Sequence, residues 1–195
     1  MSTNRWRLEI GALMLILYGV VSAGGAAGAG EARAQTPFDF RKGQDFYTLG
    51  ACYQNARGGE NTYIATVTGG IGSYFLDNAA YEIQLAGYYT HDGEDAAGLG
   101  INVLGRYQFF NWDRYSIYGD VFVGLFGTTD DFPTGGTCIN GTYGGGPGLS
   151  IRLRDGVELN AGLRFQHVSN GYIAGPDRHP IFNSFGGYLG LQWTR

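Results

Sequence analysis

The chain has 195 residues, of which 15% are charged and 15% aromatic, and 35 are glycine. Disordered chains are rich in charge and poor in aromatic residues, so this composition excludes them. The glycines follow no three-residue period, which excludes a collagen-like helix. Thirteen Lys and Arg against 17 Asp and Glu give a net charge of -4, which argues against a nucleic-acid-binding protein held by phosphate contacts.

Residues 1–34 have the features of a secretory signal peptide. Arg5 and Arg7 precede an apolar run over residues 10–21, and Ala32-Arg33-Ala34 matches an A-x-A cleavage pattern. An N-terminal membrane anchor is the alternative, but the apolar run is shorter than the roughly 20 residues that a spanning helix needs. The sequence therefore predicts cleavage and export.

The predicted mature domain, residues 35–195, is a series of segments in which apolar and polar residues alternate. In one of them Ile83 and Leu85 share one face, and Glu82 and Gln84 share the other. Such segments are long enough for tilted strands that cross a bilayer. We expect eight of them, at about residues 44–57, 61–76, 79–91, 98–110, 113–127, 141–154, 157–170 and 182–194.

An even set of eight such segments predicts an all-β protein, an eight-stranded antiparallel up-and-down transmembrane β-barrel. In this fold the apolar face meets lipid and the polar face lines the lumen. A soluble, lipocalin-like barrel is the alternative. The charged and amide residues expected to line the lumen are Glu82, Gln84, Asn102, Arg106, Asp120, Arg152, Arg154, Glu158 and Arg164.

The connections between strands indicate an orientation. Tight turns at 77–78, 111–112 and 155–156 alternate with longer loops, expected around 58–60, 92–97, 128–140 and 171–181. Outer-membrane barrels have short periplasmic turns and longer external loops, so we expect the outer membrane of a Gram-negative bacterium. Aromatic residues near the strand ends are predicted to form interface girdles: Tyr74, Phe75, Tyr88, Tyr89, Phe109, Phe110, Trp112, Tyr115 and Trp193.

The C-terminal end of segment 157–170 contains residues that could form a catalytic site. His167 and Ser169 lie two residues apart on the apolar face of segment 157–170, so their Cα atoms are about 7 Å apart on the same side of the strand. An imidazole at that spacing can reach the hydroxyl, which is the first requirement for an activated serine nucleophile. The alternative is that both residues belong to a solvated rim.

The stretch His167-Val168-Ser169-Asn170, at the end of the penultimate strand of a small exported barrel, resembles the H-x-S-N motif of outer-membrane lipid A 3-O-deacylases (the PagL family). The resemblance implies an active site on the outer wall and hydrolysis of the acyl chain at position 3 of lipid A. It also implies that Ser169 is the nucleophile, that His167 is the general base, and that Asn170 contributes to oxyanion stabilisation. Lipopolysaccharide is the expected partner, a homodimer is possible, and no cofactor or metal is expected.

The sequence departs from this pattern at the third catalytic residue. The family places a glutamate at the start of the last strand, where this chain has Asn183 on the apolar face. An amide can orient an imidazole but adds no charge, so a slower enzyme is expected. Asp177, in the preceding loop, is the alternative orienting residue, and loss of activity is a third possibility. A non-catalytic barrel with a structural or adhesive role is the rival function.

Two cysteines lie in the predicted mature domain. Cys52 and Cys138 are the only cysteines of the chain. Export permits a disulfide between them, but two cysteines alone do not indicate a disulfide framework. The sequence leaves open whether they pair.

Overall fold

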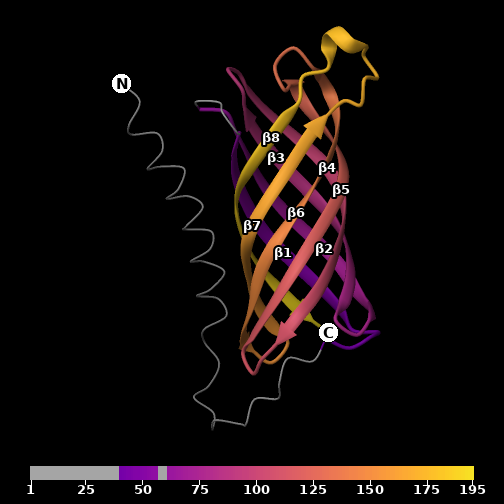
Figure 1. Ribbon diagram of the computed structural model, residues 1–195, viewed down its shortest axis with the longest axis vertical. Helices are drawn as coiled ribbons and strands as arrows, with labels where there is room; N and C mark the ends of the chain where they lie inside the picture. The colour runs from indigo at the N-terminus through magenta and orange to yellow at the C-terminus, as the bar shows by residue number, and fades with distance from the viewer. Residues whose placement is uncertain (1–39, 57–60) are drawn as a thin grey trace. The chain divides into compact units, whose positions relative to one another are not determined.

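The computed structural model describes residues 40–56 and 61–195, which include a closed antiparallel barrel (Figure 1). Each strand pairs with its neighbours in sequence, and the first strand closes the barrel against the last. The strands are β1 (Asp45–Ala56), β2 (Tyr63–Leu76), β3 (Ala79–His91), β4 (Asp95–Asn111), β5 (Tyr115–Phe132), β6 (Thr137–Arg154), β7 (Val157–Ser169) and β8 (Phe182–Thr194). The predicted fold class is confirmed.

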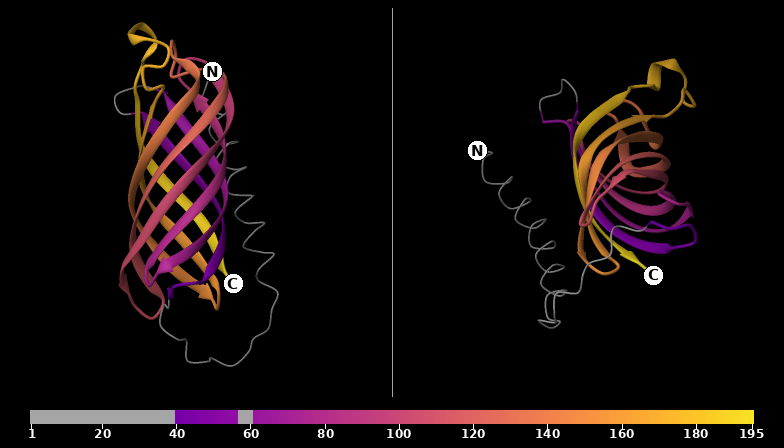
Figure 2. Two further views of the ribbon diagram at one scale, coloured as in Figure 1. Left: turned by 90° about the vertical axis from the view of Figure 1, so that its right-hand side faces the viewer. Right: turned by 60° about the horizontal axis from the view of Figure 1, so that its bottom comes forward.

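The strands are inclined to the barrel axis, and the connection from β7 to β8 projects from one end (Figure 2). This connection contains a short 3-10 helix, η1 (Pro176–Arg178). Within the described residues, no helix combines the length and the apolar character needed to cross a membrane. The signal peptide expected at residues 1–34 lies outside the described part of the chain.

Two of the predicted external loops are wrong in length. The loop expected at 92–97 is reduced to 92–94, and the loop expected at 128–140 is reduced to 133–136, because β4, β5 and β6 run further than the apolar alternation does. In the β5–β6 extension Phe132 pairs with Thr137. The hydroxyl of Thr128 donates a hydrogen bond to the carbonyl of Cys138 at 3.3 Å. The strand pairing is therefore irregular over residues 128–131 and resumes at Phe132, beyond the point where the apolar pattern stops.

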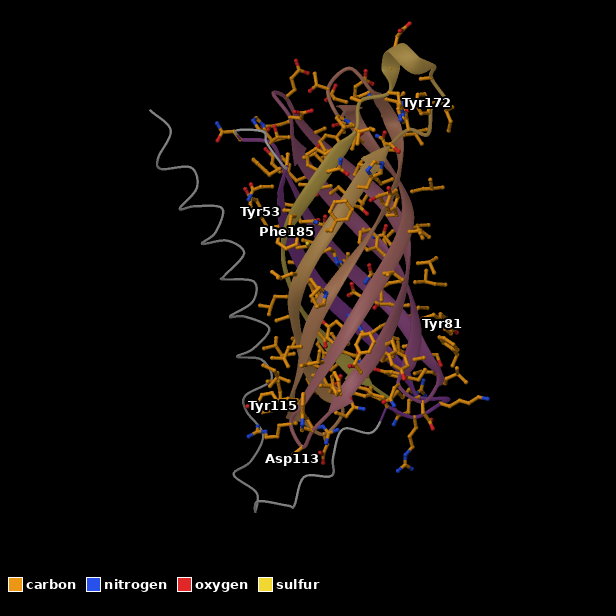
Figure 3. The ribbon with its side chains drawn as sticks, in the orientation of Figure 1. Tyr53, Tyr81, Asp113, Tyr115, Tyr172 and Phe185 are labelled. Carbon is orange, nitrogen blue, oxygen red and sulfur yellow. The ribbon has the colours of Figure 1, made fainter. Side chains whose placement is uncertain are left out.

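The predicted alternation of faces is confirmed along the wall. Since successive side chains of a strand point to opposite sides, Glu82, Asn102 and Asp120 are buried inside while Leu99 and Val121 are 69% and 68% exposed. Figure 3 shows side chains projecting outward around the barrel, with Tyr53 and Phe185 toward one end and Tyr81 and Tyr115 toward the other. The exposed apolar side chains form the belt that a bilayer requires; they include Val67, Ile71, Ile83, Leu85, Leu99, Ile101, Val103, Val121, Val123, Leu125 and Leu163.

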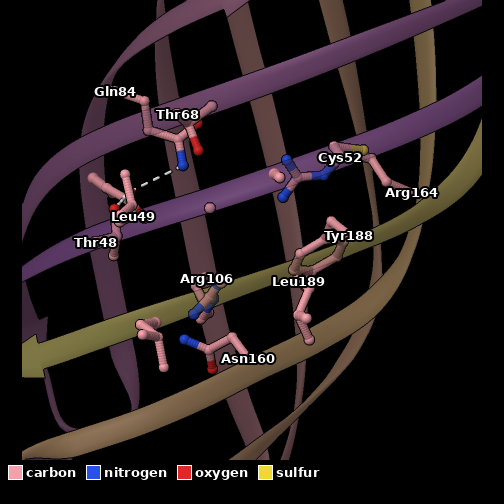
Figure 4. A pocket seen from close by; sticks show the side chains of 15 residues that line it. Thr48, Leu49, Cys52, Thr68, Gln84, Arg106, Asn160, Arg164, Tyr188 and Leu189 are labelled. Carbon is pink, nitrogen blue, oxygen red and sulfur yellow. Dashed lines mark hydrogen bonds between the residues drawn. The ribbon is translucent and has the colours of Figure 1, made fainter. Parts of the chain in front are cut away.

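Asp120 lies at the centre of the polar interior. Its Oδ2 atom is 3.0 Å from Nη2 of Arg164 and 3.5 Å from Nη2 of Arg106, and it accepts a hydrogen bond from the hydroxyl of Tyr188 at 3.1 Å. Figure 4 shows Arg106, Arg164 and Tyr188 around a cavity of about 40 Å³. This volume has room for only a few water molecules, so side chains fill the described lumen.

Apolar clusters close both ends of the lumen. Tyr74 and Tyr88, which we expected in the interface girdles, belong to these clusters and are 1% and 4% exposed. That prediction is wrong because both residues have the parity of the inward face. The cluster at the external end contains Ile64, Ala86, Tyr88, Phe126, Phe132, Val168 and Phe182, and the one at the opposite end contains Phe40, Phe46, Tyr74 and Ala80.

Arg154 is the one residue of the predicted lumen set that lies on the surface. The register between β6 and β7 shifts between Arg152 and Arg154. Such a bulge turns the following side chain away from the face that strict alternation predicts. Arg152 is therefore buried while Arg154 is exposed.

Both cysteines are free. Cys52 is buried and Cys138 is exposed. The thiol of Cys138 donates a hydrogen bond to Oδ1 of Asp131 at 3.4 Å. The structure therefore has no disulfide between the two residues.

Candidate functional site

His167 lies near the C-terminal end of β7, the end that continues into the β7–β8 loop, with its side chain on the outer wall. Its Cα partners are Tyr143 on β6 and Asn183 on β8. All three positions have the outward parity of their strands. The register thus brings an imidazole, a phenol ring and an amide together on the lipid-facing side.

Asn183 holds the imidazole of His167 through a hydrogen bond. Nδ1 of His167 and Oδ1 of Asn183 are 2.8 Å apart. An amide oxygen can only accept, so Nδ1 carries the proton, and in the neutral ring Nε2 is then the unprotonated nitrogen. This is the tautomer that a general base needs.

Asp177, the alternative orienting residue, is not brought to His167. It lies exposed in η1. Among the described residues it makes no hydrogen bond to either His167 or Ser169. Of the two orienting candidates, only Asn183 contacts the ring.

The sequence did not reveal the aromatic partner of His167. The ring of Tyr143 stacks on the imidazole with centroids 4.6 Å apart and an interplanar angle of 29°. A regular two-residue turn at 155–156 would place Gly144 opposite His167. The bulge at Arg152–Arg154 moves the register by one residue and brings Tyr143 there instead.

Ser169 is the last residue of β7 and lies two residues beyond His167 on the same face. Within the described structure its hydroxyl makes no hydrogen bond to the imidazole. Its Cα partner on β6 is Gly141, which has no side chain to cover it. The hydroxyl and the imidazole are therefore neighbours on an open strip of the outer wall, and no hydrogen bond joins them among the described residues.

Asn170 is buried and connects the end of β7 to the β7–β8 loop. Its Oδ1 atom is 2.7 Å from Nδ1 of His179 and accepts a hydrogen bond from the backbone N–H of Tyr172 at 3.2 Å. Its Nδ2 atom donates to the carbonyl of Arg178. One side-chain amide thus fixes both ends of the loop against Ser169.

Arg178 ties the same loop to the β5–β6 hairpin. Its Nη2 atom is 2.8 Å from Oδ2 of Asp131 and also donates to the carbonyl of Gly136. The loop therefore has two anchors, Asn170 at its base and Asp131 on the neighbouring hairpin. Together these contacts define the position of the backbone that follows Ser169.

The described residues offer no cluster of three or more His, Cys, Asp or Glu side chains that could hold a metal ion. What the outer-wall residues can do is acid–base chemistry. An unprotonated imidazole nitrogen, a nearby hydroxyl and an orienting amide are the parts of a serine hydrolase site.

No protein-family model matches this sequence, and neither does any curated protein. The outer membrane enzyme PagL matches the structure with a TM-score of 0.56 at 14% identity, covering 74% of this chain and 97% of PagL. Neisserial surface protein A (NspA) matches with a TM-score of 0.55 at 15% identity, covering 77% of this chain and 96% of NspA. At these identities the likeness shows the fold alone. The chain has the eight-stranded fold of outer-membrane barrels.

Proposed function

We propose that this protein is an outer-membrane serine esterase that hydrolyses the 3-O-linked acyl chain of lipid A. The observation that carries the proposal is the 2.8 Å contact from Nδ1 of His167 to Oδ1 of Asn183. His167 lies two residues before Ser169 on the same outer face of β7. A polar group that faces lipid costs free energy unless it is paired. The polar network inside the barrel does not require an imidazole on the outer wall, so a functional role explains its position better than a structural one. The H-x-S-N motif gives this arrangement a chemical meaning.

In the proposed reaction the hydroxyl oxygen of Ser169 bonds to the ester carbonyl carbon of the acyl chain, and its proton passes to Nε2 of His167. The bond from that carbon to the sugar oxygen then breaks, and the sugar oxygen takes the proton from Nε2. Water attacks the acyl-Ser169 ester and gives a proton to Nε2. The Ser169 oxygen leaves, recovers this proton, and releases a free 3-hydroxy fatty acid.

Asn170 is the proposed donor to the oxyanion. A side-chain amide nitrogen carries two hydrogens, and the contact to the Arg178 carbonyl uses one of them. The second hydrogen is the one that we propose binds the negative charge developing beside Ser169. In a well-studied hydrolase, one such donor lowers the activation barrier by about 3 kcal/mol.

The substrate reaches this site without entering the barrel. Leu125 on β5, Gly141 on β6 and Ser169 on β7 form one cross-strand row on the outer wall. Leu125 is exposed. An acyl chain in the outer leaflet lies against just such a surface, so only the ester group has to be positioned. Lipopolysaccharide as partner is part of this proposal.

The proposal is tested in cells. The protein is expressed in a Gram-negative host whose lipid A keeps both 3-O-linked chains, and the lipid A is compared by mass spectrometry with that of cells carrying the empty vector. We expect a new species lighter by one 3-hydroxyacyl chain. Identical spectra, with the protein folded in the outer membrane, would contradict the esterase function.

Replacing Asn183 with aspartate is expected to raise kcat/KM for lipid A by about tenfold. Hydrogen bonds to charged groups are stronger than neutral ones by about 1 to 1.5 kcal/mol, and each 1.36 kcal/mol is tenfold in rate. Aspartate keeps the shape of the side chain and adds a negative charge opposite the imidazolium. Asn55→Asp, an exposed position on the outer face of β1, is the matched control and should leave the rate unchanged. Equal rates for the Asn183→Asp variant and the wild type would argue against Asn183 as the orienting residue.

A non-catalytic barrel with a structural or adhesive role is the second candidate. The observation that favours it is that no hydrogen bond joins Ser169 and His167 in the described part of the structure. In hydrolases this contact often tightens only when substrate binds, which is why the esterase is preferred. The lipid A experiment separates the two functions directly.

A further inference from the structure

Tyr143 covers one face of the His167 ring from the neighbouring strand. The two residues are Cα partners across β6 and β7, and their ring centroids are 4.6 Å apart. Tyr143 is 52% exposed on the outer wall. It is therefore not a core residue, and packing of the lumen does not explain its place.

The imidazole has two close side-chain neighbours of different chemistry. Asn183 binds Nδ1 and orients the ring, but an amide carries no net charge. The face of a phenol ring carries the negative side of its π quadrupole and attracts a cation within about 6 Å of the centroid. The Tyr143 ring lies within that distance of the imidazole.

We propose that Tyr143 is a positioning residue that stabilises the protonated form of His167 through a cation–π contact. This inference rests on the proposed esterase function for its catalytic meaning. When Nε2 takes the proton of Ser169, the ring becomes positive against the phenol face. When Nε2 returns the proton to the sugar oxygen, the charge is lost again. Tyr143 itself gains and loses no atom.

No formal charge faces His167 from the strands beside it. On β6 the opposite residue is Tyr143, and on β8 it is Asn183. The charged or titratable groups of the adjoining β7–β8 loop are Asp177, which is exposed, Arg178, which is paired with Asp131, and Tyr172 and His179, whose rings stack on each other. Replacing Tyr143 therefore changes the stack without removing a formal charge beside the ring. The next outward residues on its own strand are Phe165 and Ser169, both uncharged.

The contact is tested by NMR titration of the histidine rings in protein refolded in detergent micelles. In Tyr143→Leu we expect the titration midpoint of the His167 ring to fall by about 0.4 to 0.7 pH units, because the cationic form loses its π partner. Tyr143→Phe keeps the ring face and should stay within about 0.2 units of the wild type. His167→Gln assigns the signal, and His91 and His179 are internal references. An unchanged midpoint in Tyr143→Leu overturns the proposal.

Kinetics test the catalytic meaning. Tyr143→Leu should lower kcat about threefold with KM unchanged. This factor is the cation–π free energy lost in the variant, converted into a rate. Tyr81→Leu, an outward tyrosine on β3, is the matched control and should keep the wild-type rate. A shifted titration with an unaltered kcat would overturn the catalytic role. A wild-type protein without esterase activity would contradict the proposed function, while the titration would still decide whether Tyr143 stabilises the charged ring.

Discussion

Replacing Ser169 with alanine is expected to lower the rate of acyl release from lipid A by about 10⁴-fold or more. Removal of the nucleophile from a serine hydrolase costs this much because no other group can form the acyl intermediate. Binding should change little, since the alanine keeps the apolar strip beside Gly141. The measurement is release of 3-hydroxy fatty acid from lipid A by refolded, purified protein in mixed micelles.

Ser73→Ala is the matched control for this variant. Ser73 is a partly exposed serine on the outer face of β2, near the opposite end of the strand, and its replacement should leave the rate unchanged. The folded state of both variants is checked by the shift in gel mobility on heating. A Ser169→Ala protein that is folded and as active as the wild type would exclude Ser169 as the nucleophile.

Replacing Asp120 with asparagine is expected to destabilise the folded barrel by about 3 to 5 kcal/mol. Asp120 is paired with Arg106 and Arg164 inside the lumen. Removing one partner of a buried ion pair leaves an uncompensated buried charge, which costs about this much. The variant keeps the shape of the side chain, so loss of packing does not explain the effect. Urea titration of the folded fraction in detergent gives the free energy of unfolding.

Asp113→Asn is the control for the charge change itself. Asp113 lies exposed in the β4–β5 turn (Figure 3), and surface substitutions of this kind usually change stability by less than about 0.5 kcal/mol. A difference of less than about 1 kcal/mol between the two variants would contradict the role of Asp120 as counter-ion.

The barrel could be predicted from the sequence because its wall follows a period of two. Lipid on one side and packed polar groups on the other force a strict alternation, so the inward or outward direction of residues such as Leu99 and Glu82 can be read directly. The external strand ends could not be read in this way. Residues 128–131 of the β5–β6 hairpin are polar on both faces, and only the strand pairing beyond them, Phe132 with Thr137, shows where the hairpin ends.

The same distinction applies to the candidate site: positions that follow strand parity could be predicted, and positions that depend on register or on loop contacts could not. The outward parity of His167, Ser169 and Asn183 follows from their strands, and the pairing of His167 with Asn183 is the geometry that parity allows. Tyr143 could not be found because a bulge changes the register by one residue. The arrangement of the β7–β8 loop around Asn170 depends on long-range contacts, such as Arg178 with Asp131, that no local pattern encodes.

The lumen is filled by side chains, and this has a consequence for the cell that carries the protein. Water-filled porins admit small solutes through an open channel, whereas this lumen holds a buried ion cluster between two apolar clusters and only small cavities, which leaves little room for solutes to pass. Many copies can therefore accumulate without making the envelope leaky to detergents or antibiotics.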